Sequence, residues 1–115
     1  GYNAISSMIN NSGTKFSAIV AAGDTMAIGA IRALNDSKRH VPNDVAVAGF
    51  DDIELSSLFN PTLTTVRQPK FQIGVRSMEK LLDLIAGNSL AAGRDILNYE
   101  LIIRESSGNF VGNRN

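Results

Sequence analysis

Two short segments of small apolar residues constrain this fold more than any other feature of the sequence. They span residues 16–22 (FSAIVAA) and 45–50 (VAVAGF), and neither alternates apolar with polar side chains. Strands of this kind are typical of parallel sheets, because helices cover both faces of such a sheet. Between them, residues 24–35 carry apolar side chains at helical spacing. We therefore expect a β–α–β unit in an α/β fold, with a parallel sheet and flanking helices.

The rest of the chain continues this pattern on both sides. The expected elements are a helix over 2–9, a short helix over 53–59, a strand over 64–66, a long helix over 70–86 and a strand over 96–103. Gly87 is expected just beyond the end of the long helix. We interpret the Met and Phe side chains of that helix as core packing, and residues 108–115 as a disordered tail.

Composition limits the classes of function. The chain has 115 residues, enough for one domain at most, and its eleven basic and eleven acidic residues cancel. Zero net charge argues against nucleic acid or an anionic membrane as a direct partner. With no cysteine and one histidine, the sequence offers no disulfide, no thiol nucleophile and no usual zinc site, and we expect no cofactor. Because the chain begins inside a predicted helix, we expect a fragment that lacks its N-terminal portion.

Three aspartates are expected at the carboxyl edge of the sheet, where ligands bind in parallel α/β folds. Asp24 follows the first apolar segment, and Asp51 and Asp52 follow the second. With no Lys or Arg nearby, this edge should repel phosphate and suit a neutral polyhydroxylated ligand; a divalent cation is the other candidate. Asp51 is the preferred ligand residue. We interpret Asp24 as the N-cap of its helix and Asp52 as a cap of the next one.

Four motifs then carry a resemblance to a known family: GDTMAIGAIRAL, VPNDVAVAGFDDIE, PTLTTVRQP and ELIIRESS. Over about residues 16–107, the chain resembles the C-terminal half of the effector-binding domain of LacI/GalR-type bacterial transcription regulators. The resemblance implies a fold like a type I periplasmic sugar-binding protein, with two α/β subdomains around a ligand cleft. It implies that residues 1–107 are a partial effector-binding domain, mainly the C-terminal subdomain. The helix over 70–86 would belong to the N-terminal subdomain of the intact protein.

The resemblance also implies which residues bind the effector and the second subunit. Asp51 matches an aspartate that holds sugar hydroxyls, or a purine in one branch of the family. Gly23 matches a ligand-contacting position that is often asparagine, so glycine there removes one polar contact, and Thr25 falls on a neighbouring cleft position. Positions of the family's dimer interface are matched by Ile28, Leu58 and Phe59. Ordinary core packing is the other interpretation of these three residues.

The implied function requires no catalysis. The chain would be the effector-binding and dimerisation part of a cytoplasmic, homodimeric repressor that responds to a sugar or its phosphate. It would reach operator DNA only through a missing N-terminal helix-turn-helix, and would not bind membranes. One alternative is a periplasmic sugar-binding protein of a transporter. A second is a phosphotransfer domain with aspartates and Mg²⁺, which would need a lysine at the sheet edge; the only nearby one, Lys70, begins a helix.

Overall fold

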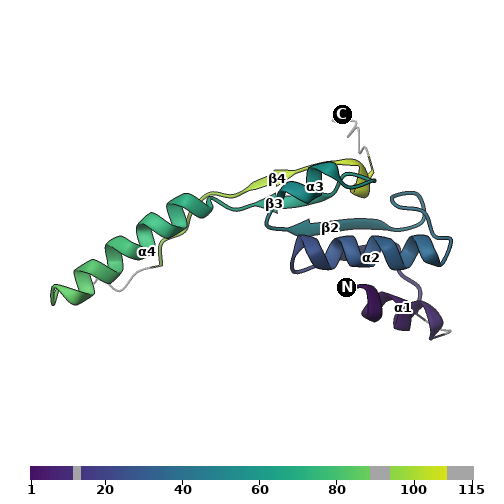
Figure 1. The fold of residues 1–115 in the computed structure, drawn as a ribbon, viewed down its shortest axis with the longest axis horizontal. Coiled ribbons are helices and arrows are strands. Elements are labelled where there is room, and N and C mark those ends of the chain that lie inside the picture. The colour runs from purple at the N-terminus through teal and green to yellow at the C-terminus, as the bar shows by residue number, and fades with distance from the viewer. Residues whose placement is uncertain (12–13, 89–93, 109–115) are drawn as a thin grey trace, which may run out of the picture. The chain divides into compact units, whose positions relative to one another are not determined.

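The computed structural model describes residues 1–11, 14–88 and 94–108. The elements in chain order (Figure 1) are α1 (Tyr2–Asn10), β1 (Ala18–Val20), α2 (Asp24–Asp36), β2 (Ala46–Phe50), α3 (Glu54–Leu58), β3 (Thr64–Arg67), α4 (Lys70–Ile85), β4 (Glu100–Ile102) and the 3₁₀ helix η1 (Glu105–Ser107). The chain divides into two compact units: unit 1 comprises Gly1–Arg67 and Leu101–Asn115, and unit 2 comprises Gln68–Glu100.

The strands form one sheet in the order β1–β2–β3–β4. The β1–β2 and β2–β3 pairs are both parallel, and Ala48 in β2 lies in register with Val20 on one side and Thr64 on the other. The helix α2 connects β1 to β2, as a parallel pair requires. The predicted β–α–β unit and the α/β class with flanking helices are therefore confirmed.

The core of unit 1 lies between α2 and the sheet. The buried face of α2 includes Ile31 and Leu34, both fully buried, and it packs against Val47 of β2 and Leu63 just before β3. Burial of each such side chain contributes roughly 1.5–3 kcal/mol to stability. On its other side α2 packs against α1, and the helices approach closely because residue 29 is a glycine. A Cβ there would lie 3.0 Å from the backbone nitrogen of Tyr2.

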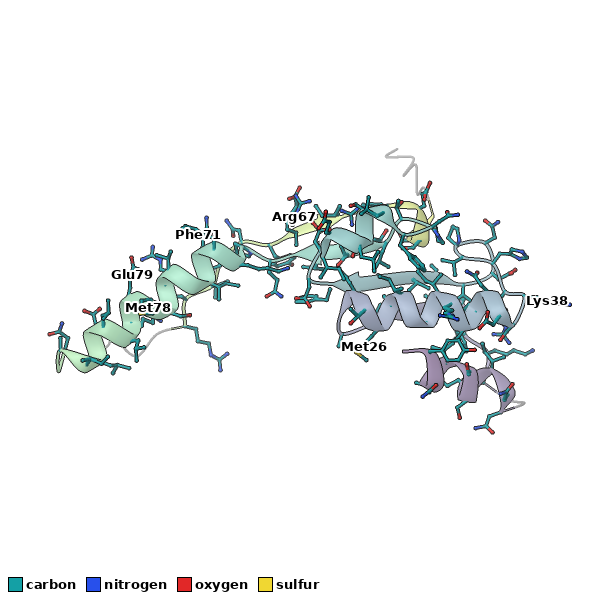
Figure 2. The ribbon with its side chains drawn as sticks, in the orientation of Figure 1. Met26, Lys38, Arg67, Phe71, Met78 and Glu79 are labelled. Atoms are coloured by element: carbon teal, nitrogen blue, oxygen red, sulfur yellow. The ribbon has the colours of Figure 1, made fainter. Side chains whose placement is uncertain are left out.

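Two expectations about burial are wrong. The first apolar segment is not covered on both faces, since Val20 of β1 is 84% exposed; β1 is the terminal strand of the sheet and has only β2 beside it. Within the described residues, the apolar side chains of α4 are not packed in a core, because Phe71 is 84% and Met78 is 54% exposed. Both project from α4 (Figure 2), and unit 2 has no second described layer that could cover them.

Local hydrogen bonds explain how α4 ends and how η1 is held. Gly87 has φ +77 and donates its N–H to the carbonyl of Leu84, so the predicted glycine just beyond α4 is confirmed. In η1, the buried Ser106 hydroxyl donates to the carbonyl of Val47 at 2.6 Å and accepts the N–H of Thr64 at 2.8 Å. This turn thereby ties the C-terminal part of unit 1 to β2 and β3. Of the predicted tail over 108–115, all but Gly108 lies outside the described residues.

Candidate effector-binding edge

The carboxyl end of β2 is held in an uncommon backbone conformation. Asp51 has φ +112 and Asp52 has φ +46, and positive φ is rare outside glycine, although Asp and Asn tolerate it better than most residues. The N–H of Asp51 donates to the carbonyl of Val66 in β3 at 2.9 Å, which fixes the turn against the sheet. Backbone outliers of this kind persist only where the surroundings enforce them, and they concentrate at ligand sites.

Asp51 and Gly23 lie side by side, as the parallel sheet predicts. A Cβ placed on Gly23 would lie 3.8 Å from Oδ2 of Asp51, an ordinary van der Waals distance. Both residues are partly exposed. The turns that follow β1 and β2 therefore share one edge, and the Asp51 carboxylate stands at it.

Asp24 has a different role from the one predicted. The N-cap of α2 is Gly23, and no side chain caps the helix; Asp24 is its first residue and is 1% exposed. Its Oδ2 accepts the hydroxyl of Ser56 at 2.6 Å and the N–H of Ile53 at 2.9 Å, and its Oδ1 accepts the hydroxyl of Thr65 at 2.5 Å. The capping interpretation is wrong because these three donors, from α3 and β3, hold the carboxylate inside the protein.

A close backbone approach makes room for the Asp24 carboxylate. The buried Gly49 of β2 faces it, and a Cβ on Gly49 would collide with Oδ1 of Asp24 and lie 3.0 Å from Cδ2 of Leu63. Only a residue without a side chain permits the first turn of α2 to lie so near the strand. The glycine in VAVAGF is thus required by the position of Asp24.

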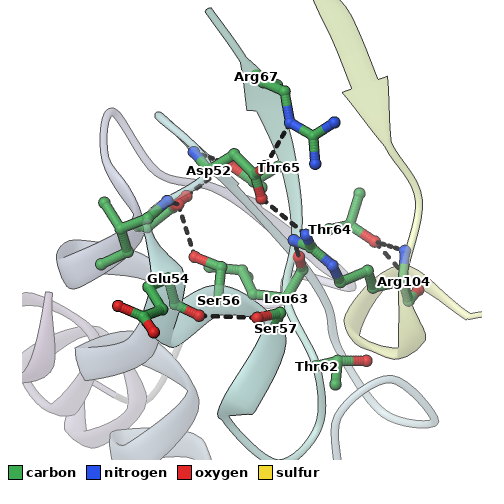
Figure 3. Close-up of polar contacts among 12 residues, drawn as sticks. Asp52, Glu54, Ser56, Ser57, Thr62, Leu63, Thr64, Thr65, Arg67 and Arg104 are labelled. Carbon is green, nitrogen blue, oxygen red and sulfur yellow. Dashed lines mark hydrogen bonds and ion pairs between the residues drawn. The ribbon is translucent and has the colours of Figure 1, made fainter.

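Asp52 forms two ion pairs with arginines (Figure 3). Its Oδ1 accepts Nη2 of Arg104 at 2.7 Å, and its Oδ2 accepts Nε of Arg67 at 2.6 Å. Arg104 also donates from Nη1 to the carbonyl of Leu63 at 2.7 Å. Burial of Asp52 acts to raise the pKa of its carboxyl, but the hydrogen bonds and charges of Arg104 and Arg67 outweigh it and hold that pKa below its usual value.

These ion pairs correct two expectations. Asp52 does not cap α3, whose N-cap is Ile53 without a side-chain cap bond, because its carboxylate is turned toward the two arginines. The expectation that the edge lacks basic residues is also wrong: Arg67 and Arg104 come from distant parts of the sequence and meet there. With Asp24 buried and Asp52 paired, the edge is less acidic than the sequence predicts.

The described residues offer little support for a metal site. Residues 1–11, 14–88 and 94–108 contain no group of three His, Cys, Asp or Glu side chains that could hold a metal ion. The carboxylates of Asp24 and Asp52 are both engaged by protein donors.

The remaining predicted residues are exposed or partly exposed residues of unit 1. Thr25, Ile28 and Phe59 line an open hollow of ≈ 800 Å³, together with Tyr2, Gly29, Arg32, Asn35 and Asp36. Leu58, at the end of α3, is 72% exposed. The structure thus brings Thr25 together with two of the predicted interface positions. The effector role of Thr25 and the interface roles of Ile28, Leu58 and Phe59 stay predictions.

Sequence reasoning missed the polar residues that organise this edge. Ser56 and Thr65 are fully buried hydroxyls that donate to Asp24, and nothing in their sequence surroundings distinguishes them from exposed residues. Arg104 lies 52 positions from Asp52, and no sequence pattern pairs them. The one available signal was Gly49, since an isolated glycine in a strand indicates a bulge or a close backbone approach.

Comparison with known proteins identifies the family. The sequence pattern of the periplasmic binding protein-like domain matches residues 2–107. The chain belongs to this family. This periplasmic binding protein-like chain is 43% identical over 93 residues to the HTH-type transcriptional regulator RegA of Clostridium saccharobutylicum. The alignment covers 81% of the chain and 28% of RegA. It is 39% identical over 114 residues to the HTH-type transcriptional regulator MalR of Streptomyces coelicolor, covering 99% of the chain and 32% of MalR.

Solved structures of transcriptional regulators are also similar to the periplasmic binding protein-like chain. The Lac repressor dimer bound to operator and the anti-inducer ONPF superimposes with a TM-score of 0.82 at 34% identity, over 93% of this chain and 32% of the repressor chain. The complex of the transcriptional regulator CelR with cellobiose gives 0.72 at 39% identity, over 78% and 28%. The resemblance to the effector-binding domain of LacI-type regulators is confirmed, and the chain spans about a third or less of these relatives.

The relatives also bear on the two alternative functions, a sugar-binding protein of a transporter and a phosphotransfer domain. They are transcriptional regulators, not enzymes, and they do not favour a transport protein. Among the described helices of the periplasmic binding protein-like chain, none has the length and apolar character needed to cross a membrane.

Proposed function

We propose that this chain is the effector-binding and dimerisation part of a cytoplasmic, sugar-responsive transcriptional repressor. The names of its relatives support the class: RegA and MalR are HTH-type transcriptional regulators, and the CelR structure holds cellobiose. The operator would be bound by a helix-turn-helix in another part of the full-length protein, in keeping with the zero net charge of this chain.

The position of Asp51 carries the proposal. Its carboxylate stands at the carboxyl edge of β2 beside Gly23, on a backbone with φ +112. A carboxylate at this edge can accept two hydroxyl hydrogens from one sugar. Charge-assisted hydrogen bonds of this kind contribute about 1.5–3 kcal/mol each.

A calorimetric titration of the full-length protein tests this role, with cellobiose and lactose among a panel of sugars. Asp51→Asn should weaken binding about 10–100-fold, because the amide replaces one charged acceptor with a donor. Asparagine also tolerates positive φ, so the turn should keep its conformation. Asp44→Asn is the matched control, since Asp44 lies in an exposed loop of the same unit. Unchanged affinity in Asp51→Asn, or a wild-type protein that binds no sugar of the panel, would refute the proposal.

The hollow beside α2 is proposed as part of the homodimer interface. It is lined by Ile28 and Phe59 and adjoins the end of α3, where Leu58 is 72% exposed. A second copy is the proposed occupant because the related Lac repressor structure is a dimer. Sedimentation velocity of the full-length protein should show a dimer that Leu58→Glu converts to monomer, since burial of an unpaired carboxylate is costly. A wild-type monomer, or a Leu58→Glu dimer, would count against this face.

A further inference from the structure

The ion pairs of Asp52 join the loop that carries Asp51 to two distant segments of unit 1. Arg67 is the last residue before the chain passes into unit 2, and Arg104 lies three positions after the chain re-enters unit 1 at Leu101. We name residues 64–67 and 101–104 the chain crossings. A single carboxylate therefore holds the outgoing crossing with one oxygen and the returning crossing with the other.

Burial and a further hydrogen bond hold Asp52 in place. Its side chain is 9% exposed and that of Arg104 is 16% exposed, so both groups have lost most of their water. The backbone N–H of Asp52 donates to the hydroxyl of Thr65 at 3.3 Å, and that hydroxyl donates to Asp24. The Arg104 pair is therefore screened less by salt than a surface ion pair, whereas the Arg67 side chain is 51% exposed.

The crossings are also bound to each other. The hydroxyl of Thr64 accepts the N–H of Arg104 at 2.8 Å, and Arg104 donates to the carbonyl of Leu63 (Figure 3). On the other side, the N–H of Asp51 donates to Val66 within the outgoing crossing. The turn at residues 51–52 and both crossings thus form one connected polar network.

We propose that Asp52 is a positioning residue, which fixes the two chain crossings and, through them, the backbone from which Asp51 meets the effector. The inference rests on the proposed function, because Asp51 serves there as the effector ligand. Asp52 itself is turned toward the two arginines. Its role is to couple the ligand-binding turn to the segments through which the chain reaches unit 2.

Hydrogen exchange of the full-length protein, measured without any sugar, tests whether Asp52 holds the two chain crossings. Asp52→Asn should speed amide exchange in residues 64–67 and 101–104 by at least about tenfold, because one neutral amide cannot satisfy both guanidinium groups. Exchange in the core of α2, residues 27–34, should stay as in the wild type. Asp44→Asn is the matched control: it removes an exposed carboxylate that pairs with His40 in the same unit, and should change neither region.

A graded substitution at the partner separates positioning from simple stability. Arg104→Lys keeps the positive charge but not the second donor to the carbonyl of Leu63, so it should restore part of the protection that Arg104→Gln loses. Unchanged exchange at the crossings in Asp52→Asn would overturn the proposal, as would equal acceleration in α2, which would mean general destabilisation. The two proposals can be refuted independently. A wild-type protein that binds no sugar refutes the effector role of Asp51. The positioning role of Asp52 is tested only by the rate of amide exchange at the chain crossings.

Discussion

Replacement of Asp24 by alanine would leave two buried hydroxyls and one partly buried N–H without their acceptor. The carboxylate, 1% exposed, receives the hydroxyls of Ser56 and Thr65 and the N–H of Ile53. Each buried donor left unsatisfied costs about 1–3 kcal/mol. Because the two hydroxyls can rotate toward other acceptors, we expect a total loss of about 3–5 kcal/mol in the free energy of unfolding. That loss is a large part of the roughly 5–15 kcal/mol typical of a domain.

Urea denaturation followed by circular dichroism measures this loss, and two variants calibrate it. Asp24→Asn keeps one acceptor oxygen and should lose only about 1–2 kcal/mol, because its amide can donate to the Thr65 hydroxyl in place of accepting from it. Asp36→Ala is the matched control on the same helix: Asp36 is exposed and accepts only the Tyr2 hydroxyl among the described bonds, so its removal should cost less than about 1 kcal/mol. An Asp24→Ala protein as stable as Asp36→Ala would refute the buried-network reasoning.

Two further outcomes follow from the same region. Gly49→Ala should lower the urea-unfolding free energy by about 1–3 kcal/mol, because the new methyl group collides with Asp24, whereas Gly74→Ala, with open space at its Cβ, should be neutral or slightly stabilising. The pKa of Asp52 is lower when folded than when unfolded, since the pairs with its arginines outweigh burial. Its contribution to stability is therefore complete above about pH 4 and is lost as the pH falls through the folded pKa. A urea-midpoint profile from pH 7 to 3 should decline less steeply in Asp52→Asn; an unchanged decline would contradict this assignment.

The apolar segments predicted the strands and the connecting helix because local pattern and tertiary structure agree there. The predicted strand over 45–50 is observed at Ala46–Phe50, and the predicted helix over 24–35 at Asp24–Asp36. A continuous apolar run and helical spacing suffice at these places, since Val47 of β2 and the face of α2 that carries Ile31 and Leu34 are buried.

The candidate site was predictable only in part. The position of Asp51 at the strand end followed from sheet topology, and its closeness to Gly23 agrees with that prediction. The roles of Asp24 and Asp52 were not predictable, because their partners are distant in sequence: Thr65 is 41 positions from Asp24, and Arg104 is 52 from Asp52. An aspartate after a strand looks the same in sequence whether it faces a ligand, a hydroxyl or an arginine.

The buried hydroxyl of Ser106 has a consequence for the order in which the polypeptide is made. It bonds to Val47 and Thr64, yet the whole of unit 2 is synthesised between those residues and Ser106. On the ribosome, β2 and β3 must therefore wait for the last described residues before their bonding is complete. A nascent chain halted before Ser106 keeps the Thr64 N–H and the Val47 carbonyl without this partner and should remain sensitive to protease. Emergence of Ser106 from the ribosome is thus the step that completes this bonding.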